Sequence, residues 1–382
     1  MLFYLSQYVL SLCKGTIWAD WLSPLRVFRY ITFRSAGAAV TAMVLSWWLG
    51  PRVIAWLKEL NFGQNYRDRA ETTGNITRRA SEKLGTPTMG GLLIVMTLNL
   101  TTLLWAQWNT LVQLTLLSVV VLCGLGFYDD YTKIVRESAG GTKSRVKLWV
   151  QTALALFIGL YLWQVPATTK LVSEIMVPFY KHPVATGVAA VGILLTVVTI
   201  VGSSNAVNLT DGLDGLAIGC TLIVSFAFLV MTYLAGNFRT ATYLQIPYVA
   251  GAGELTVFCA AMIGAGMGFL WYNCHPAQVF MGDTGSLALG GALGIIAVLI
   301  HQPFVLFIAG GVFVMEAASV IIQVSYFRYT KQRYGAGRKF FLMSPLHHHF
   351  EKKNWHESQV VMRFYILCVL CAVVALSTLK IR

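Results

Sequence analysis

Residues 111–130 read LVQLTLLSVVVLCGLGFYDD, a long apolar run that ends in two adjacent aspartates. A helix needs about 20 mainly apolar residues to cross the hydrocarbon core of a bilayer, and this run has that length. Carboxylates are costly inside a bilayer, so the two aspartates are expected where the helix leaves the membrane. The stretch therefore predicts a membrane-spanning helix that carries polar chemistry at one end.

The same apolar pattern recurs along the whole chain. Of the 382 residues, 56% are hydrophobic and only 12% are charged, whereas soluble proteins carry about 25% charged residues. A soluble enzyme is therefore excluded. We expect an all-α, polytopic membrane protein that forms one domain over residues 1–382. Its roughly ten transmembrane helices are expected at about 34–57, 89–106, 111–128, 148–164, 186–202, 215–235, 255–271, 284–300, 304–327 and 360–379.

The distribution of basic residues predicts the orientation. If the spans alternate, the loops on one side of the membrane hold about 20 Lys and Arg residues and those on the other side about nine. Basic loops stay in the cytoplasm, so we expect both termini outside and the functional face inside. The same rule accounts for the net charge of +13, and no nucleic-acid partner is expected.

The aspartates give an independent signal. Of the seven in the chain, five lie at the membrane edges of the predicted cytoplasmic loops: Asp129, Asp130, Asp211, Asp214 and Asp283. Because carboxylates beside a membrane tend to mark function, five on one face indicate a metal or proton site. The simpler alternatives are a solvated helix end balanced by Lys133, and N-caps of the helices that follow.

Four segments break the apolar pattern. In NAVNLTDGLDGLA (205–217), two aspartates three residues apart share a face of one helical turn, and glycines allow the backbone to approach an anion closely. The irregular WYNCHPAQVFMGDTGS (271–286) suits the wall of a cavity. KLGTPTMGG (83–91) offers a lysine to a phosphate. The histidine triplet in SPLHHHFEKKNW (344–355) can bind a metal, contact phosphate or be solvated.

These features together indicate an enzyme. Mg²⁺ prefers oxygen ligands and is usually bound by one or two carboxylates plus substrate phosphates. Clustered aspartates, a lysine and glycine-rich turns therefore suit phosphoryl transfer at a membrane surface, with a lipid as one substrate. The competing class is a cation-coupled transporter, but transporter sites lie near mid-bilayer, whereas these aspartates lie at one edge.

KLGTPTMGG, GFYDDYTK, NAVNLTDGLDGLA, NCHPAQVFMGDTGSLALGGALG and PLHHHFE together resemble the phospho-N-acetylmuramoyl-pentapeptide-transferase family, or translocase I. The family is a branch of the polyprenyl-phosphate N-acetylhexosamine-1-phosphate transferases, ten-helix proteins with a cytoplasmic active site. The resemblance extends over nearly the whole chain. It implies Mg²⁺-dependent transfer of phospho-MurNAc-pentapeptide from UDP-MurNAc-pentapeptide to undecaprenyl phosphate, which yields UMP and lipid I. It further implies a multi-pass homodimer in the bacterial cytoplasmic (inner) membrane that serves peptidoglycan synthesis, cell shape and division.

The resemblance also implies roles for single residues. Asp129 and Asp130 match the family's paired catalytic aspartates, and Asp283 matches its Mg²⁺ ligand. A further catalytic group is the histidine triplet, His347, His348 and His349. The positions matched to substrate binding are Lys83, Thr88, Asn208, Asp211, Gly212, Leu213, Asp214, Asn273 and Phe280. Glu316 also matches a family position.

The mechanism that these assignments suggest is a direct displacement. Mg²⁺ on Asp283 and the diphosphate would neutralise charge on the departing UMP, while Asp129 or Asp130 orients or deprotonates the lipid phosphate. A double displacement through an aspartyl-phosphate is the alternative route. The alternative function is transfer of GlcNAc-1-phosphate to the same lipid, by an enzyme that would differ around PLHHHFE.

Overall fold

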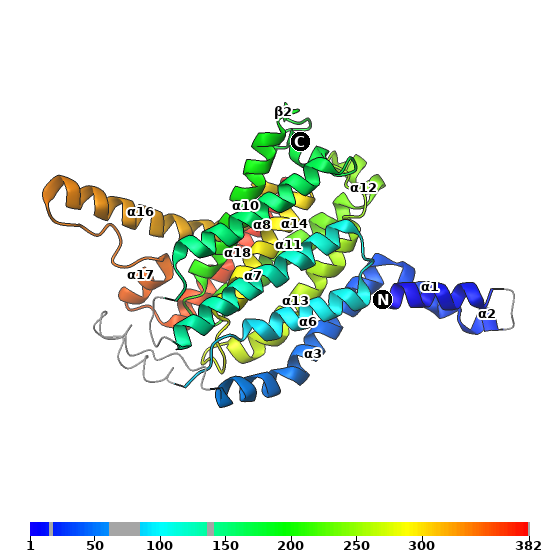
Figure 1. Cartoon of the computed structure of the whole chain (residues 1–382), viewed down its shortest axis with the longest axis horizontal. Helices are drawn as coiled ribbons and strands as arrows, with labels where there is room; N and C mark the ends of the chain where they lie inside the picture. Colours follow the sequence, from blue (N-terminus) through cyan, green and yellow to red (C-terminus); the bar gives the residue numbers. More distant parts are fainter. Residues whose placement is uncertain (15–17, 61–84, 136–140, 381–382) are drawn as a thin grey trace.

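The computed structural model describes residues 1–14, 18–60, 85–135 and 141–380, which form an almost entirely helical bundle (Figure 1). Nine helices in this part of the chain are long and apolar enough to cross a membrane, and α6 is a shorter apolar helix. Every predicted span contains a helix, so the predicted polytopic membrane fold is confirmed. The long helices are α3 (Ile31–Glu59), α6 (Gly91–Trp105), α7 (Thr110–Val135), α8 (Ser144–Gln164), α10 (Ala189–Thr210), α11 (Leu216–Ala235), α13 (Gly253–Asn273), α14 (Gly282–Leu299), α16 (Gly311–Tyr334) and α18 (Glu357–Ser377).

A helix able to span a membrane is confirmed for the predicted span at about 304–327, but it begins later than predicted, at Gly311. The chain forms a short helix, α15 (Pro303–Ala309), and α16 begins after Gly310. Two consecutive glycines, Gly310 and Gly311, have low helix propensity and let the chain change direction there. As a result α16 leaves the bundle and projects away from it (Figure 1).

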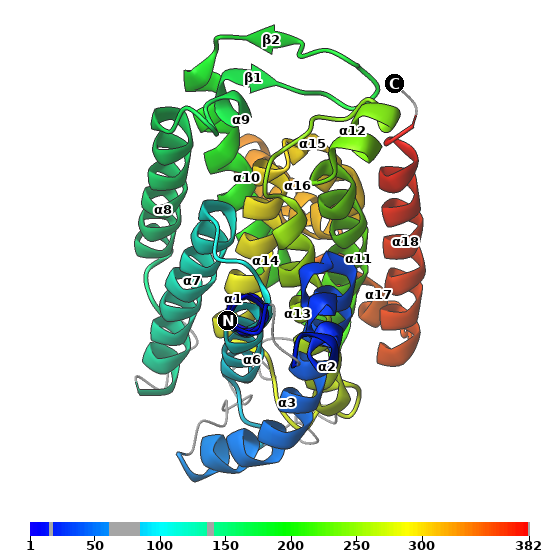
Figure 2. The same cartoon turned by 90° about the vertical axis from the view of Figure 1, so that its right-hand side faces the viewer.

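Short elements connect the spans. Two-residue strands β1 (Glu174–Ile175) and β2 (Ala185–Thr186) pair antiparallel at one end of the bundle (Figure 2). The remaining short helices are α1 (Leu2–Leu12), α2 (Trp18–Trp21), η1 (Ser23–Arg29), α9 (Lys170–Ser173), α12 (Phe238–Leu244) and α17 (Leu346–Lys352).

Both chain ends lie at the same end of the bundle. The amino group of Met1 donates a hydrogen bond to the carbonyl of Leu103, near the end of α6 (3.0 Å). The Nζ atom of Lys380 lies 3.7 Å from the ring centroid of Tyr243, in the short helix that follows α11. An even number of crossings between the two termini is consistent with this placement.

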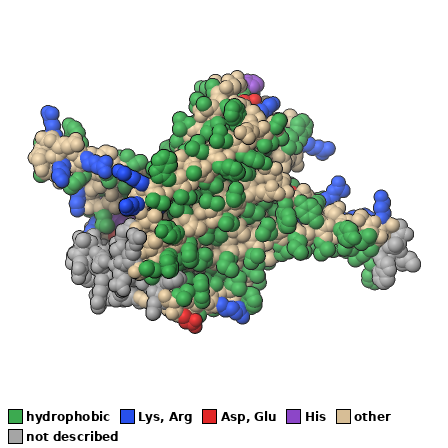
Figure 3. All heavy atoms as spheres, in the orientation of Figure 1, with side chains coloured by type: hydrophobic (Ala, Val, Ile, Leu, Met, Phe, Trp, Pro, Cys, Tyr) green, Lys and Arg blue, Asp and Glu red, His purple; other side chains and the backbone are tan. Residues whose placement is uncertain are grey.

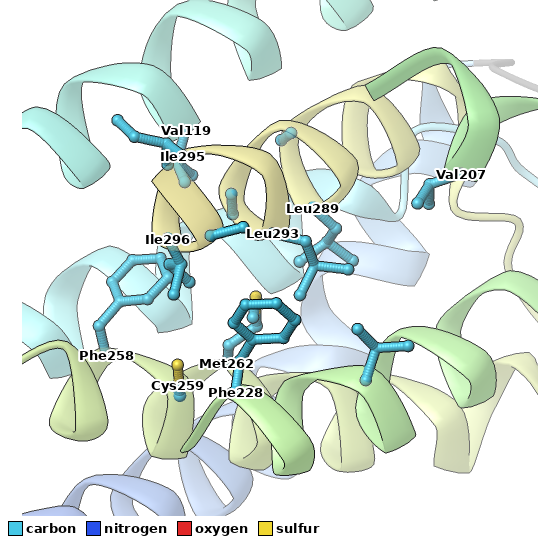
Figure 4. Close-up of a cluster of buried hydrophobic side chains, with 14 of the residues drawn as sticks. Val119, Val207, Phe228, Phe258, Cys259, Met262, Leu289, Leu293, Ile295 and Ile296 are labelled. Carbon is cyan, nitrogen blue, oxygen red and sulfur yellow. The ribbon is translucent and has the colours of Figure 1, made fainter. Parts of the chain in front are cut away.

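Helix α14 forms the centre of the fold. Every residue from Thr284 to Leu299 is buried, and apolar side chains of α14 contact those of α7, α11 and α13 (Figure 4). Glycines allow backbones to approach closely. A Cβ at Gly91 would overlap the backbone nitrogen of Gly285, and one at Gly290 would lie 2.5 Å from the carbonyl oxygen of Ser203. Because the lipid gives helices no hydrophobic drive to associate, this close packing stabilises the bundle.

The outer surface is predominantly apolar, as expected for contact with lipid (Figure 3). Lys and Arg side chains gather at the projecting end of α16 (Figure 3). That end includes Arg328, Lys331 and Arg333, all of which are exposed.

Candidate active site

Three aspartates meet where α7 ends and α14 begins. Asp129, Asp130 and Asp283 each offer a carboxylate oxygen, and these oxygens lie within 4.8 Å of one another. The two helices touch at a glycine, because a Cβ at Gly126 would overlap the carbonyl oxygen of Asp283. This packing brings the aspartates of two distant sequence segments into one site.

Two lysines lie between the carboxylates. The Nζ atom of Lys133 lies 2.7 Å from Oδ2 of Asp129 and 3.1 Å from Oδ2 of Asp283. The Nζ atom of Lys147, on α8, lies 2.8 Å and 2.5 Å from the same two oxygens. Sequence reasoning gave Lys133 only as the counter-charge of a solvated helix end, although the spacing of DDYTK places it one helical turn beyond the aspartates. It did not assign Lys147 to this cluster. Three ionised aspartates against two lysines leave the cluster with an excess negative charge.

The adjacent aspartates have different contacts. Asp130 accepts hydrogen bonds from the backbone N–H (3.0 Å) and the hydroxyl (2.8 Å) of Thr284, and so anchors the first turn of α14. Asp129 uses Oδ1 to accept the backbone N–H of Thr142 (2.8 Å), while its Oδ2 faces both lysines. Consecutive helical residues point about 100° apart, which is why the pair separates in this way.

Asn208 fixes the orientation of the Asp283 carboxylate. It lies in the last turns of α10 and donates hydrogen bonds to Oδ1 of Asp283 and to the hydroxyl of Ser286, both at 2.8 Å. The Oδ2 atom of Asp283 remains with the lysines.

The segment before α6 joins the same site. The backbone of Phe280 bonds to Pro87 and Gly90, each at 2.8 Å. Thr88 is buried, and a Cβ at Gly282 would lie 2.8 Å from its hydroxyl and 2.5 Å from Oδ2 of Asp130. The structure therefore places Thr88 beside the carboxylates, whereas Lys83 lies outside the described residues.

The turn between α10 and α11 contains Asp211, Gly212 and Leu213. Burial raises the pKa of the Asp211 carboxyl group to about 8, and the negative charges of Asp283 and Asp130 add to this increase. Asp211 therefore lies close enough to the cluster to respond to its charge.

A second polar cluster follows this turn. The Oδ2 atom of Asp214 lies 3.1 Å from Nδ1 of His275, and the backbone N–H of Asp214 donates to Oε1 of Glu357 (3.0 Å). Asn273 accepts the backbone N–H of Gly215 (3.1 Å). Sequence reasoning gave His275 and Glu357 no role, because Glu357 is 143 residues from Asp214 and only the fold brings them together.

The histidine triplet lies in α17, and its members point in different directions. His347 is buried against Glu316, and a Cβ at Gly212 would overlap its Nε2 atom. The Nδ1 atom of His348 lies 2.7 Å from Oε2 of Glu351. His349 accepts a hydrogen bond from the backbone N–H of Leu342 (3.2 Å). The contact between His347 and Gly212 connects the triplet to the Asp211–Gly212 turn.

The carboxylate cluster is suited to a metal ion. Its donors are carboxylate oxygens, which hard divalent cations prefer. The lysine ammonium groups already occupy positions between these oxygens and act as counter-ions, so a divalent cation at Asp283 would take the place of lysine contacts.

Comparison of the chain with known protein families shows which class of enzyme contains this charged cluster. The model of the glycosyl transferase family 4 matches residues 112–301, a range that includes both cluster helices. The chain is thus a membrane phospho-sugar transferase.

The comparison also identifies the branch. The phospho-N-acetylmuramoyl-pentapeptide-transferase signature 1 matches residues 83–95. The chain is 46% identical to the phospho-N-acetylmuramoyl-pentapeptide-transferase of Methylacidiphilum infernorum over the full length of both. It is 48% identical to that of Opitutus terrae, over 95% of this chain and 98% of the relative. The transferase of Neisseria gonorrhoeae is 46% identical over the same shares. The chain belongs to the phospho-N-acetylmuramoyl-pentapeptide-transferase family.

Proposed function

We propose that this protein transfers phospho-MurNAc-pentapeptide from UDP-MurNAc-pentapeptide to undecaprenyl phosphate, which gives lipid I and UMP. The observation that carries the proposal is the cluster of three carboxylates and two lysines at the α7–α14 junction. A diphosphate and a lipid phosphate are anionic substrates, and the lysines together with a divalent cation would neutralise them. The whole chain, residues 1–382, acts as one membrane domain.

The contacts of the three aspartates indicate a different role for each. Asp283, oriented by Asn208, would hold Mg²⁺ together with substrate oxygens. When bound, the ion supplies a positive charge that stabilises the departing UMP phosphate. Asp130 is occupied in anchoring α14, whereas Asp129 keeps an oxygen that faces the lysines. Asp129 is therefore our candidate for orienting or deprotonating the lipid phosphate as it attacks the β-phosphorus in line.

The turn after α10 and the segment around Phe280 would bind the nucleotide. Asn273 and Asp214 lie in one hydrogen-bonded group there, and Thr88 lies beside Gly282 at the carboxylate cluster. Lys83 would contact phosphate from the segment before α6.

The cellular setting follows from charge and family. The basic loops support a cytoplasmic active site and termini outside, in the bacterial inner membrane. The lipid-facing surface supports a substrate that stays in the bilayer (Figure 3). We further propose that the enzyme forms a homodimer, as the resemblance implies.

The experiment follows UMP release by purified protein with undecaprenyl phosphate and Mg²⁺. UDP-MurNAc-pentapeptide and UDP-GlcNAc are offered in separate reactions. We expect release only with the first donor, and its loss on addition of EDTA. Release with UDP-GlcNAc would instead assign the protein to the GlcNAc-1-phosphate transferases. An enzyme unaffected by EDTA would contradict the Mg²⁺ requirement.

A further inference from the structure

Glu316 is a buried carboxylate to which the mechanism above gives no role. It lies in α16, and its side chain is fully buried. Its two oxygens accept hydrogen bonds from the backbone N–H groups of Leu346 (2.6 Å) and His347 (3.2 Å). Because an ionised carboxylate is costly to bury without partners, these bonds fix the start of α17 against α16.

The imidazole ring of His347 extends the same contact. Its Nδ1 atom lies 3.2 Å from Oε1 of Glu316, close enough for an ion pair but not aligned for a hydrogen bond. A proton on Nδ1 would avoid repulsion between the lone pair of this nitrogen and the carboxylate.

The opposite nitrogen of His347 points to the candidate active site. Nε2 is buried and has no hydrogen-bond partner within the described part of the chain. A Cβ at Gly212 would overlap it, so glycine at this position leaves room for the ring. A buried polar atom without a partner is uncommon in folded proteins, and this one is a candidate hydrogen-bond donor to a bound ligand.

The neighbouring histidines make local contacts instead. His348 pairs with Glu351 one turn further along α17, and His349 bonds to the backbone of Leu342. Each of these contacts stabilises the segment 342–351 within itself. The member of the triplet that faces the Asp211–Gly212 turn is His347.

We propose that Glu316 is a positioning residue that holds His347 so that its Nε2–H donates a hydrogen bond to a phosphate oxygen of the bound diphosphate. The inference rests on the proposed function, because it deepens the account of that same site. An imidazole with N–H at both nitrogens is cationic, and the Glu316 carboxylate compensates this charge where solvent cannot. His347 makes no bond to phosphorus and gives up no proton in the reaction.

Three titratable groups surround the His347 ring, and their charges determine which substitution tests the role of Glu316. Glu316 faces the ring from α16, and His348 lies beside it in α17, with ring centroids 4.2 Å apart. Asp211 precedes Gly212 in the turn that faces Nε2. Of these groups, Glu316 places a negative charge directly against the ring. Removing the charge of Glu316 is therefore the change that tests its effect on His347.

The experiment is a double-mutant cycle of Glu316→Gln and His347→Asn, with kcat and KM for UMP release measured from pH 6 to pH 9. The glutamine side chain would keep the shape of the original and one backbone hydrogen bond but lose the charge. We expect E316Q to lower kcat about 30-fold at pH 8. In the H347N background the same change should cost less than about threefold. An equal loss with and without His347 would show that Glu316 only supports the fold.

The matched control is Glu351→Gln, which removes the other Glu–His pair of the same helix. Its pair is partly exposed to solvent, so we expect kcat within about twofold of the wild type at every pH. A loss as large as that of E316Q would mean that any charge change in α17 disturbs the enzyme, and would overturn the proposal.

A readout that does not depend on activity separates this inference from the proposed function. Ring ¹⁵N signals of [¹⁵N]histidine-labelled protein in lipid bilayers, with His347 assigned by its loss in H347N, report the protons on each nitrogen. We expect both nitrogens to be protonated at pH 6.5 in the wild type, and Nε2 to lose its proton in E316Q. Normal UMP release with a singly protonated His347 would overturn the inference. A doubly protonated ring without UMP release by the wild type would instead contradict the proposed function.

Discussion

The two ends of the bundle each bury charged side chains, but in different balance. At the end where the chain termini lie, Arg34 and Glu254 form a bidentate pair with distances of 2.6 and 2.7 Å, and Glu254 also accepts the backbone N–H of Gln107. At the other end, three aspartates share two lysines, and the lysine side chains remain 20–21% exposed. The first arrangement is closed and neutral, whereas the second has an uncompensated charge and access to solvent.

This difference separates a structural ion pair from a functional one. In a bidentate Arg–carboxylate pair, the two opposite charges cancel and both carboxylate oxygens accept hydrogen bonds. Such a pair therefore does not attract a further ion. A cluster with excess carboxylate is stabilised when a cation or an anionic substrate with its cation arrives. Burial alone would have ranked the Arg34–Glu254 pair above the Lys147–Asp283 pair, while charge balance and access to solvent identify the α7–α14 junction as the site.

The largest effect should come from the substitution Asp283→Asn. It removes the charge shared by both lysines and the candidate metal ligand, so we expect kcat to fall by about 10³-fold or more. Mg²⁺ affinity, measured by calorimetric titration, should fall with it, while the thermal unfolding temperature changes little. Unchanged metal affinity would place the metal elsewhere.

The opposite result is expected at the other end of the bundle. Arg34→Met leaves the Glu254 carboxylate buried without its partner, which should cost about 3–5 kcal/mol of stability. Thermal unfolding in detergent measures the loss, and activity per folded molecule should stay near that of the wild type. The double variant Arg34→Met with Glu254→Leu should recover most of the stability. A large drop in activity per folded molecule would mean that the two ends are coupled.

A smaller effect should follow from Lys147→Gln. Removal of a cation that contacts Asp283 strengthens the attraction of the cluster for a divalent ion, so we expect the Mg²⁺ affinity to rise about tenfold. The exposed Lys143, on the same segment, is the matched control, and Lys143→Gln should change the affinity by less than about twofold. If both variants behave alike, the effect is one of overall charge and not of the cluster.

The smallest effect concerns pH and the stability of the protein without metal. The pKa of Asp211 is raised to about 8 by burial, from an ordinary value near 4. The folded state then binds a proton that the unfolded chain releases, so stability is lost as the pH rises from about 4 to about 8. We expect the unfolding temperature measured with EDTA to fall between pH 6 and pH 8.5, and Asp211→Asn to reduce that fall. An equal fall in this variant would assign the pH dependence to other groups.

The sequence predicts the parts of this protein that depend on local pattern. Apolar runs such as residues 111–128 give the spans, because length and hydropathy alone decide whether a helix can cross a bilayer. The alternation of basic loops brings the aspartates to one end, where the structure places Asp129, Asp130 and Asp283 together.

Contacts that the fold creates between distant residues were not predictable in this way. The contacts of Lys147 required the placement of α8 beside the junction, and this lysine is 136 residues from Asp283. The pairing of Glu316 with His347 depends on how the chain returns after the break at Gly310, which the apolar pattern of 304–327 conceals. Residue type marks the candidates, but the partner of each depends on the path of the chain.

The length of α6 has a consequence for the surrounding membrane. With 15 residues it spans about 22 Å, less than the roughly 30 Å of hydrocarbon in a typical bilayer. The leaflet beside it must thin, or the helix ends must lie below the headgroups. Where the leaflet thins, the site at the start of α6 comes to the depth of the lipid phosphates, and where it does not thin, a lipid phosphate must move inward to reach the carboxylates. The thickness of the bilayer is then a determinant of how readily that phosphate reaches the site.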